Sequence, residues 1–142
     1  MHMHLIQETI AAQRKFEIMT DLLTDADRSA LIALSRAMKP FRDISQTSIP
    51  PSGIAAFCCV ATRPGRTISD YARMNDVSLT AMSRSIADMS TGQNRNGGAG
   101  LGLIDTRPDF NDRRQIICTL STKGAAFARQ VASAIAMRNP IR

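Results

Sequence analysis

The sequence predicts a mainly α-helical fold with one small β-hairpin. Apolar residues recur at three- and four-residue steps over most of the chain, which is the spacing of helices with one buried face. A glycine-rich stretch, Thr91 to Gly100, interrupts this spacing. The segments after it, Leu101 to Arg107 and Gln115 to Leu120, have the composition of strands. We therefore expect several helices, a hairpin and a last helix in one compact domain.

Length and composition narrow the class of protein. A chain of 142 residues suits one domain with its own core, and 44% apolar with 21% charged residues is typical of globular proteins. No apolar run reaches the roughly 20 residues of a membrane span, so we expect no membrane partner. Residues 1 to 4 lack the pattern of a signal peptide, and three cysteines without metal-ligand spacing suit a reducing compartment. The expected location is the cytoplasm.

The first part of the chain reads as three helices. Leu5 to about Leu23 has one apolar stripe, and a second helix begins after Thr24, whose spacing to Asp27 resembles a capping box, and ends near Pro40. A polar loop precedes a third helix at about 52 to 62. Its expected buried face holds Ile54, Phe57, Cys58 and Ala61.

Two short capped helices follow. The first runs from Thr67 to Met74, and the second from Ser78 to about Met89, with Thr67 and Ser78 as N-caps. Only three residues, 75 to 77, join them, which makes a helix-turn-helix candidate. The expected inward stripe of the second helix is Leu79, Met82, Ile86 and Met89.

The hairpin that comes next has a basic tip between residues 108 and 114. Ser121 or Thr122 then caps a helix that runs through Met137. Its apolar face is Phe127, Val131, Ala134 and Ile135.

Charge is distributed unevenly along the chain. Residues 1 to 60 hold six basic and six acidic residues, whereas residues 61 to 142 hold twelve and six, so the second part carries the whole net charge of +6. A local positive field is typical of proteins that bind a polyanion, because neutralised phosphates release counterions. A basic surface without a partner stays open as the alternative.

Three segments together resemble the MarR family of winged-helix regulators. They are Ser78 to Met89, Gly102 to Arg114 and Leu120 to Gly124, the last reading Leu-Ser-Thr-Lys-Gly. The resemblance covers roughly residues 49 to 130. It implies a winged helix-turn-helix lobe at 49–121 with its wing at about 101–121, a dimerisation region at 1–48 and a dimerisation helix at 122–142. The stretch 91–100 is longer than the usual turn of the family.

The second helix of the helix-turn-helix supplies the first candidate contacts to double-stranded DNA. Helix geometry places five candidate residues on or beside the face opposite its apolar stripe, or at its N-terminus: Ser78, Thr80, Ala81, Ser83 and Arg84. Arg84 suits either a guanine edge or a phosphate, and both readings stay open. For Ser78 the capping role alone is an alternative to phosphate binding.

The wing supplies the second group of candidates, Arg107, Asp112, Arg113 and Arg114. Arginines on a hairpin can enter the minor groove beside the recognition helix. The resemblance implies that Asp112 orients one of them through a charge-assisted pair. An ordinary exposed ion pair at a turn is the alternative for Asp112 and Arg113.

The resemblance also implies a homodimer on a pseudo-palindromic site, a role as repressor and release by a small-molecule effector, although no residue identifies that ligand. The alternative function is a winged-helix module that binds a protein and does not read DNA.

Other chemistries find little support. The only histidines, His2 and His4, form no catalytic or metal pattern with interior residues, so we expect no enzyme, cofactor or metal. Glycines 98, 100 and 102 lack the context of a nucleotide loop. Redox sensing by Cys58, Cys59 or Cys118 is kept as a minor alternative to a place in the core.

Overall fold

The computed structural model describes residues 2–92 and 98–137 of the chain. Its elements are helices α1 (His2–Asp21), α2 (Asp25–Ile44), α3 (Pro51–Thr62), α4 (Ile68–Met74), α5 (Leu79–Met89) and α6 (Thr122–Ala136), with strands β1 (Arg66–Thr67), β2 (Ile104–Pro108) and β3 (Ile116–Leu120). The mainly α-helical class with a hairpin is confirmed.

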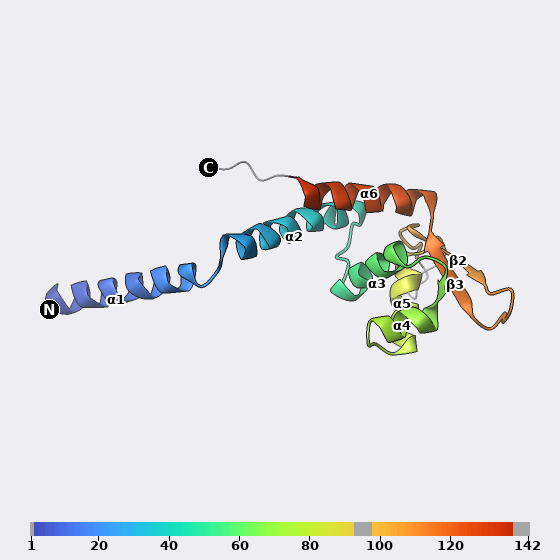
Figure 1. The fold of residues 1–142 in the computed structure, drawn as a ribbon, viewed down its shortest axis with the longest axis horizontal. Helices are drawn as coiled ribbons and strands as arrows, with labels where there is room; N and C mark the ends of the chain where they lie inside the picture. Colours follow the sequence, from blue (N-terminus) through green and yellow to red (C-terminus); the bar gives the residue numbers. More distant parts are fainter. Residues whose placement is uncertain (1, 93–97, 138–142) are drawn as a thin grey trace.

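The molecule is elongated (Figure 1). Helices α3, α4 and α5 and the small sheet form a lobe at one end, α2 and α6 lie side by side above it, and α1 extends away at the other end. The apolar side chains of α1 are exposed: Met3, Leu5, Ile6, Ile10, Phe16, Ile18 and Met19. No helix among residues 2–92 and 98–137 is both long and apolar enough to cross a membrane.

Helix α2 begins as the sequence predicts. The Asp27 backbone N–H donates to Thr24 Oγ1, and the Thr24 N–H donates to the Asp27 carboxylate, which completes the capping box. Its predicted end near Pro40 is wrong, because the helix continues to Ile44 with Pro40 inside it. Pro40 lacks one helix hydrogen bond, but burial of Pro40 and Phe41 outweighs that loss.

Three phenylalanines join the lobe to the helices above it. Phe41 on α2, Phe57 on α3 and Phe127 on α6 form mutual edge-to-face contacts, with centroids 5.0 to 5.9 Å apart. Such pairs add stability beyond their buried area. These three phenylalanines therefore sit at the centre of the core.

The sheet has three antiparallel strands in the order β1-β3-β2. The hairpin pairs Ile104 with Leu120 and Pro108 with Ile116. The sequence did not reveal β1, which pairs Arg66 with Cys118 across a long stretch of chain. Residues 101 to 103, predicted as strand, instead bond to the end of α5, where the Leu103 N–H donates to the Met89 carbonyl.

The prediction for the buried face of α3 is wrong in part. Phe57 is buried and Ile54 half-buried as expected, but Cys58 is exposed and Cys59 buried, beside Ala56 and Val60. Contacts with α5 and the sheet, on another side of α3, decide this. The sequence alone shows apolar residues nearly all round this helix.

Candidate nucleic-acid interface

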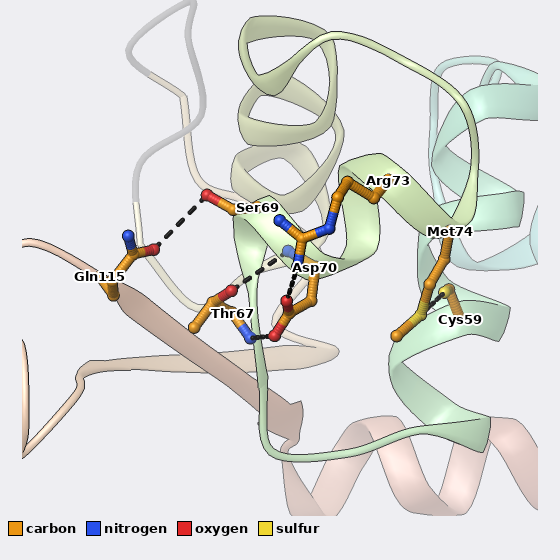
Figure 2. A network of polar contacts seen from close by, with 7 residues as sticks. All are labelled: Cys59, Thr67, Ser69, Asp70, Arg73, Met74 and Gln115. Carbon is orange, nitrogen blue, oxygen red and sulfur yellow. Dashed lines mark hydrogen bonds and ion pairs between the residues drawn. The ribbon is translucent and has the colours of Figure 1, made fainter.

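The capped turn at the start of α4 is a small polar network (Figure 2). The Asp70 N–H donates to Thr67 Oγ1 at 3.1 Å, the Thr67 N–H donates to Asp70 Oδ2 at 3.2 Å, and Arg73 pairs with the same carboxylate. The backbone hydrogen bond from Thr67 is the largest cause that lowers the pKa of Asp70 below its ordinary value. The predicted cap is confirmed, and it defines where α4 begins.

A tight turn joins α4 to α5. Asp76 has φ of 52°, in the left-handed region that aspartate tolerates better than most residues. The Val77 N–H donates to the Ala72 carbonyl at 3.0 Å, which closes the turn behind α4. Ser78 then caps α5, since its Oγ accepts the Ala81 N–H at 3.0 Å.

Helix α5 has one buried and one exposed face. Met82, Ile86 and Met89 point into the core, and Thr80, Ala81 and Arg84 are exposed on the opposite side, with Ser83 half-buried between them. Within the described part of the chain, Arg84 forms no ion pair. Its guanidinium is therefore available to an external acceptor.

Leu79 was predicted to point inward and does not. Its side chain is 54% exposed, because Leu79 is the first residue of α5 and lies beyond the edge of the core that buries Met82. Together with Val77, also exposed, it adds an apolar edge to the polar face of α5. Apolar side chains at such a position suit contact with thymine methyl groups.

The wing holds its arginines in defined positions. Asp112 Oδ1 accepts both the Arg114 backbone N–H at 3.1 Å and Arg114 Nε at 3.2 Å, while the Arg114 side chain stays 91% exposed. The resemblance to the MarR family implied such a pair between Asp112 and one of the wing arginines. Arg113 is also exposed. Arg107 places its guanidinium 5.6 Å from the ring centroid of Phe110, a residue that the sequence analysis did not single out.

The base of the wing is tied to the helix-turn-helix. Ser69 on α4 donates to Gln115 Oε1 at 3.4 Å, as Figure 2 shows. The Tyr71 hydroxyl donates to the Arg63 carbonyl at 2.6 Å and accepts the Arg66 N–H, which attaches α4 to the start of β1. The two groups of candidate residues therefore belong to one packed lobe.

The structure explains why the Leu-Ser-Thr-Lys-Gly segment ends in a glycine, Gly124. Its N–H donates to the Ser121 hydroxyl at 2.9 Å, and a Cβ at this position would overlap the Leu103 carbonyl. Lys123 donates to the Leu101 carbonyl at 2.8 Å. The start of α6 is thus packed directly against the chain that leads into the wing.

The cysteines lie apart from the candidate interface. Cys118 is fully buried in β3, and burial raises the pKa of its thiol to about 11. Burial also raises the pKa of Cys58, although that residue is exposed overall. Cys59 contacts Met74 through their sulfur atoms at 3.7 Å. A raised pKa lowers the fraction of the nucleophilic thiolate at Cys58 and Cys118, so the structure does not favour redox sensing by these two residues.

The structure brings together all nine candidates in one lobe, at the N-terminus or outer face of α5 and on the hairpin. The DNA contacts themselves stay predictions. Arg95, in the long stretch 91–100, lies outside the described residues. No group of His, Cys, Asp and Glu suited to a metal ion occurs among residues 2–92 and 98–137.

Searches by sequence found no matching family model and no matching curated protein. Solved structures do match. YusO from Bacillus subtilis superimposes with a TM-score of 0.57 at 17% identity, over 88% of this chain and 77% of that one. A MarR variant from E. coli complexed with operator DNA gives 0.54 at 17%, over 93% and 79%. Reduced AbfR bound to DNA gives 0.51 at 21%, over 100% and 88%. The chain has the winged-helix fold of the MarR regulators.

Proposed function

We propose that the chain is a DNA-binding transcriptional regulator without catalytic activity, and that it acts in the cytoplasm as a homodimeric repressor. The observation that carries the proposal is the wing arginine Arg114, which is held by Asp112 and fully presented to solvent. A pre-oriented guanidinium loses less conformational freedom on binding a phosphate or entering a minor groove.

The recognition helix supports the same function. The exposed face of α5 carries Thr80, Ala81 and Arg84, two small side chains and one exposed cation that suit a major groove. Asp112 and the cap residue Ser78 would act by positioning Arg114 and α5. Two of the three structural neighbours described above are complexes with DNA, which supports an analogous role for this lobe.

The proposed dimer rests on the apolar residues of α1. A helix of 20 residues that leaves this much apolar surface in water is marginal alone, and packing against a second copy would stabilise it. A twofold dimer presents two recognition helices about one DNA turn, roughly 34 Å, apart. The expected site is therefore pseudo-palindromic.

A small-molecule effector that controls DNA binding would need to bind where it can change the position of the lobe relative to α2 and α6. A hollow of about 420 Å³ lies between α2, the loop after it and α3, and its lining includes Phe41, Arg42 and Ile54. The mixture of apolar groups and one cation suits an anionic organic ligand. The identity of the effector stays a question for ligand screening.

The proposal is tested by selection of bound duplexes from a random pool, followed by affinity measurements over a range of salt. We expect a palindromic consensus and binding that weakens steeply with salt. Arg114→Ala should lower affinity by at least about tenfold and reduce the salt slope by roughly one per subunit.

Arg129→Ala is the matched control, because it removes the same charge from an exposed position on α6. Equal losses in both variants would mean that only overall charge matters and would contradict the wing assignment. A wild-type protein that selects no sequence but retains a protein partner in nuclease-treated lysate would favour the interaction module instead.

A further inference from the structure

The tip of the wing carries an aromatic side chain that the protein itself does not bury. Phe110 is 90% exposed, the most exposed large apolar residue of the described chain, whereas the other described phenylalanines of the lobe and its supporting helices are core residues. The ring is therefore free to contact an external partner, and its place on a wing that also carries exposed arginines suggests which one.

The backbone of the tip is ordered by its own hydrogen bonds. The Asn111 N–H donates to Asp109 Oδ1 at 3.1 Å, the Asp109 N–H donates to the Gln115 carbonyl at 2.9 Å, and the Gln115 N–H donates to the Asp112 carbonyl at 2.9 Å. Phe110 lies inside this closed turn. The backbone at Phe110 is therefore ordered before any partner binds, which reduces the entropy lost on binding.

The ring shares the wing with exposed arginines. The Arg107 guanidinium lies 5.6 Å from the ring centroid, and Arg114, near the tip of the same hairpin, is held by Asp112. This combination of an apolar ring and exposed arginines on one hairpin fits a partner that offers phosphates beside an apolar surface. The minor groove of DNA has that character: two phosphate backbones border a floor of stacked bases.

We infer that Phe110 is an apolar wedge that enters the minor groove together with the wing arginines and partly unstacks a base step. Pyrimidine–purine steps unstack most readily, so the wedge makes the wing selective for deformable sequence in addition to charge. This inference rests on the proposed function and adds a specificity-determining residue to it.

The test uses the full chain and the duplex selected above, with 2-aminopurine at the step that faces the wing. Binding of wild-type protein should raise 2-aminopurine fluorescence, because unstacking removes its quenching. Phe110→Ala should abolish the rise and lower affinity for the selected duplex by about tenfold, which corresponds to about 1.4 kcal/mol. Phe110→Leu should retain most of both, since leucine also serves as a wedge.

Asn111→Ala is the matched control, because Asn111 is exposed beside Phe110 and takes part in the turn through its backbone N–H. The salt slope should be the same in Phe110→Ala as in wild type, since no charge is lost. This separates the wedge from the arginine contacts.

The outcomes are distinct. Wild-type binding without a fluorescence rise, or equal affinity of wild type and Phe110→Ala, overturns the wedge and leaves the proposed function intact. Loss of a protein partner in Phe110→Ala with unchanged DNA binding assigns the ring to a protein contact and also overturns the inference. A wild-type protein that binds no duplex overturns the proposed function and the wedge together.

Discussion

The lobe and helix α1 use apolar residues in opposite ways. In the lobe, Phe57 is 2% exposed and contacts two other rings, whereas Phe16 on α1 is 71% exposed. The lobe shares one core with α2 and α6, which buries its apolar faces within the chain. Helix α1 extends from the rest of the chain (Figure 1), and its large apolar side chains stay exposed. Under the proposed function, the lobe would present residues to DNA and α1 would pack against a second copy.

The largest expected effect on stability comes from the core of the lobe. Phe57→Ala removes a ring that joins α3 to α2 and α6, and we expect a loss of about 3 to 5 kcal/mol in the free energy of unfolding. Phe110→Ala, the same substitution at the wing tip, should change stability by less than about 0.5 kcal/mol. Urea unfolding of the two variants measures this. Similar losses would mean that the aromatic cluster does not organise the core.

The second prediction concerns α1. Phe16→Glu places a charge on the apolar surface that we expect a second copy to cover, and it should raise the dimer dissociation constant by about 100-fold. Sedimentation velocity at several concentrations measures the shift. Gln13→Glu adds the same charge at an exposed polar position of α1 and is the control. If both variants stay as dimeric as wild type, α1 is not the dimer contact.

A smaller effect is expected at the helix-turn-helix cap. Thr67→Ala removes the hydroxyl that accepts the Asp70 N–H and should cost about 1 kcal/mol of stability. Thr67→Ser keeps a hydroxyl and should restore most of it. Chemical denaturation compares the three proteins. No difference between alanine and serine at this position would show that the cap contributes nothing measurable.

The smallest effect is a dependence on pH. Because the folded structure lowers the pKa of Asp70, its stabilising contribution is complete above the ordinary pKa of an aspartate, about 3.9, and is lost as pH falls through the lowered value. Asp70→Asn should therefore be less stable than wild type at pH 6, and this difference in the free energy of unfolding should shrink on acidification to pH 3. Thermal unfolding at both pH values measures it. A constant difference would contradict this linkage.

Much of the local structure was predictable because it depends on residues close together in the chain. The caps at Thr24, Thr67, Ser78 and Ser121 each join a side chain to the backbone three residues later, so the sequence displays both partners. The hairpin was predictable for the same reason. The positive charge of the second part was readable by counting, and it led to the arginines of the wing.

The predictions that were wrong concern features that depend on contacts between distant segments of the chain. Leu79 belongs to the inward stripe by spacing, but the core ends below it, and which side of α3 is buried depends on where α5 and the sheet lie. The exposure of Phe110 could not be predicted, because a phenylalanine in a sequence usually indicates a core residue. Its exposure became visible only with the tip of the hairpin in three dimensions.

The sequence by itself determined the order of the helices, their caps, the hairpin and the basic character of the second half, because these follow from spacing and short-range hydrogen bonds. Only the tertiary structure decided that α2 passes through Pro40, that β1 pairs with β3, and that Phe110 stands exposed beside Arg107. Each of these depends on burial or on contacts between segments far apart in the chain, and such free energies have no signature in a local pattern.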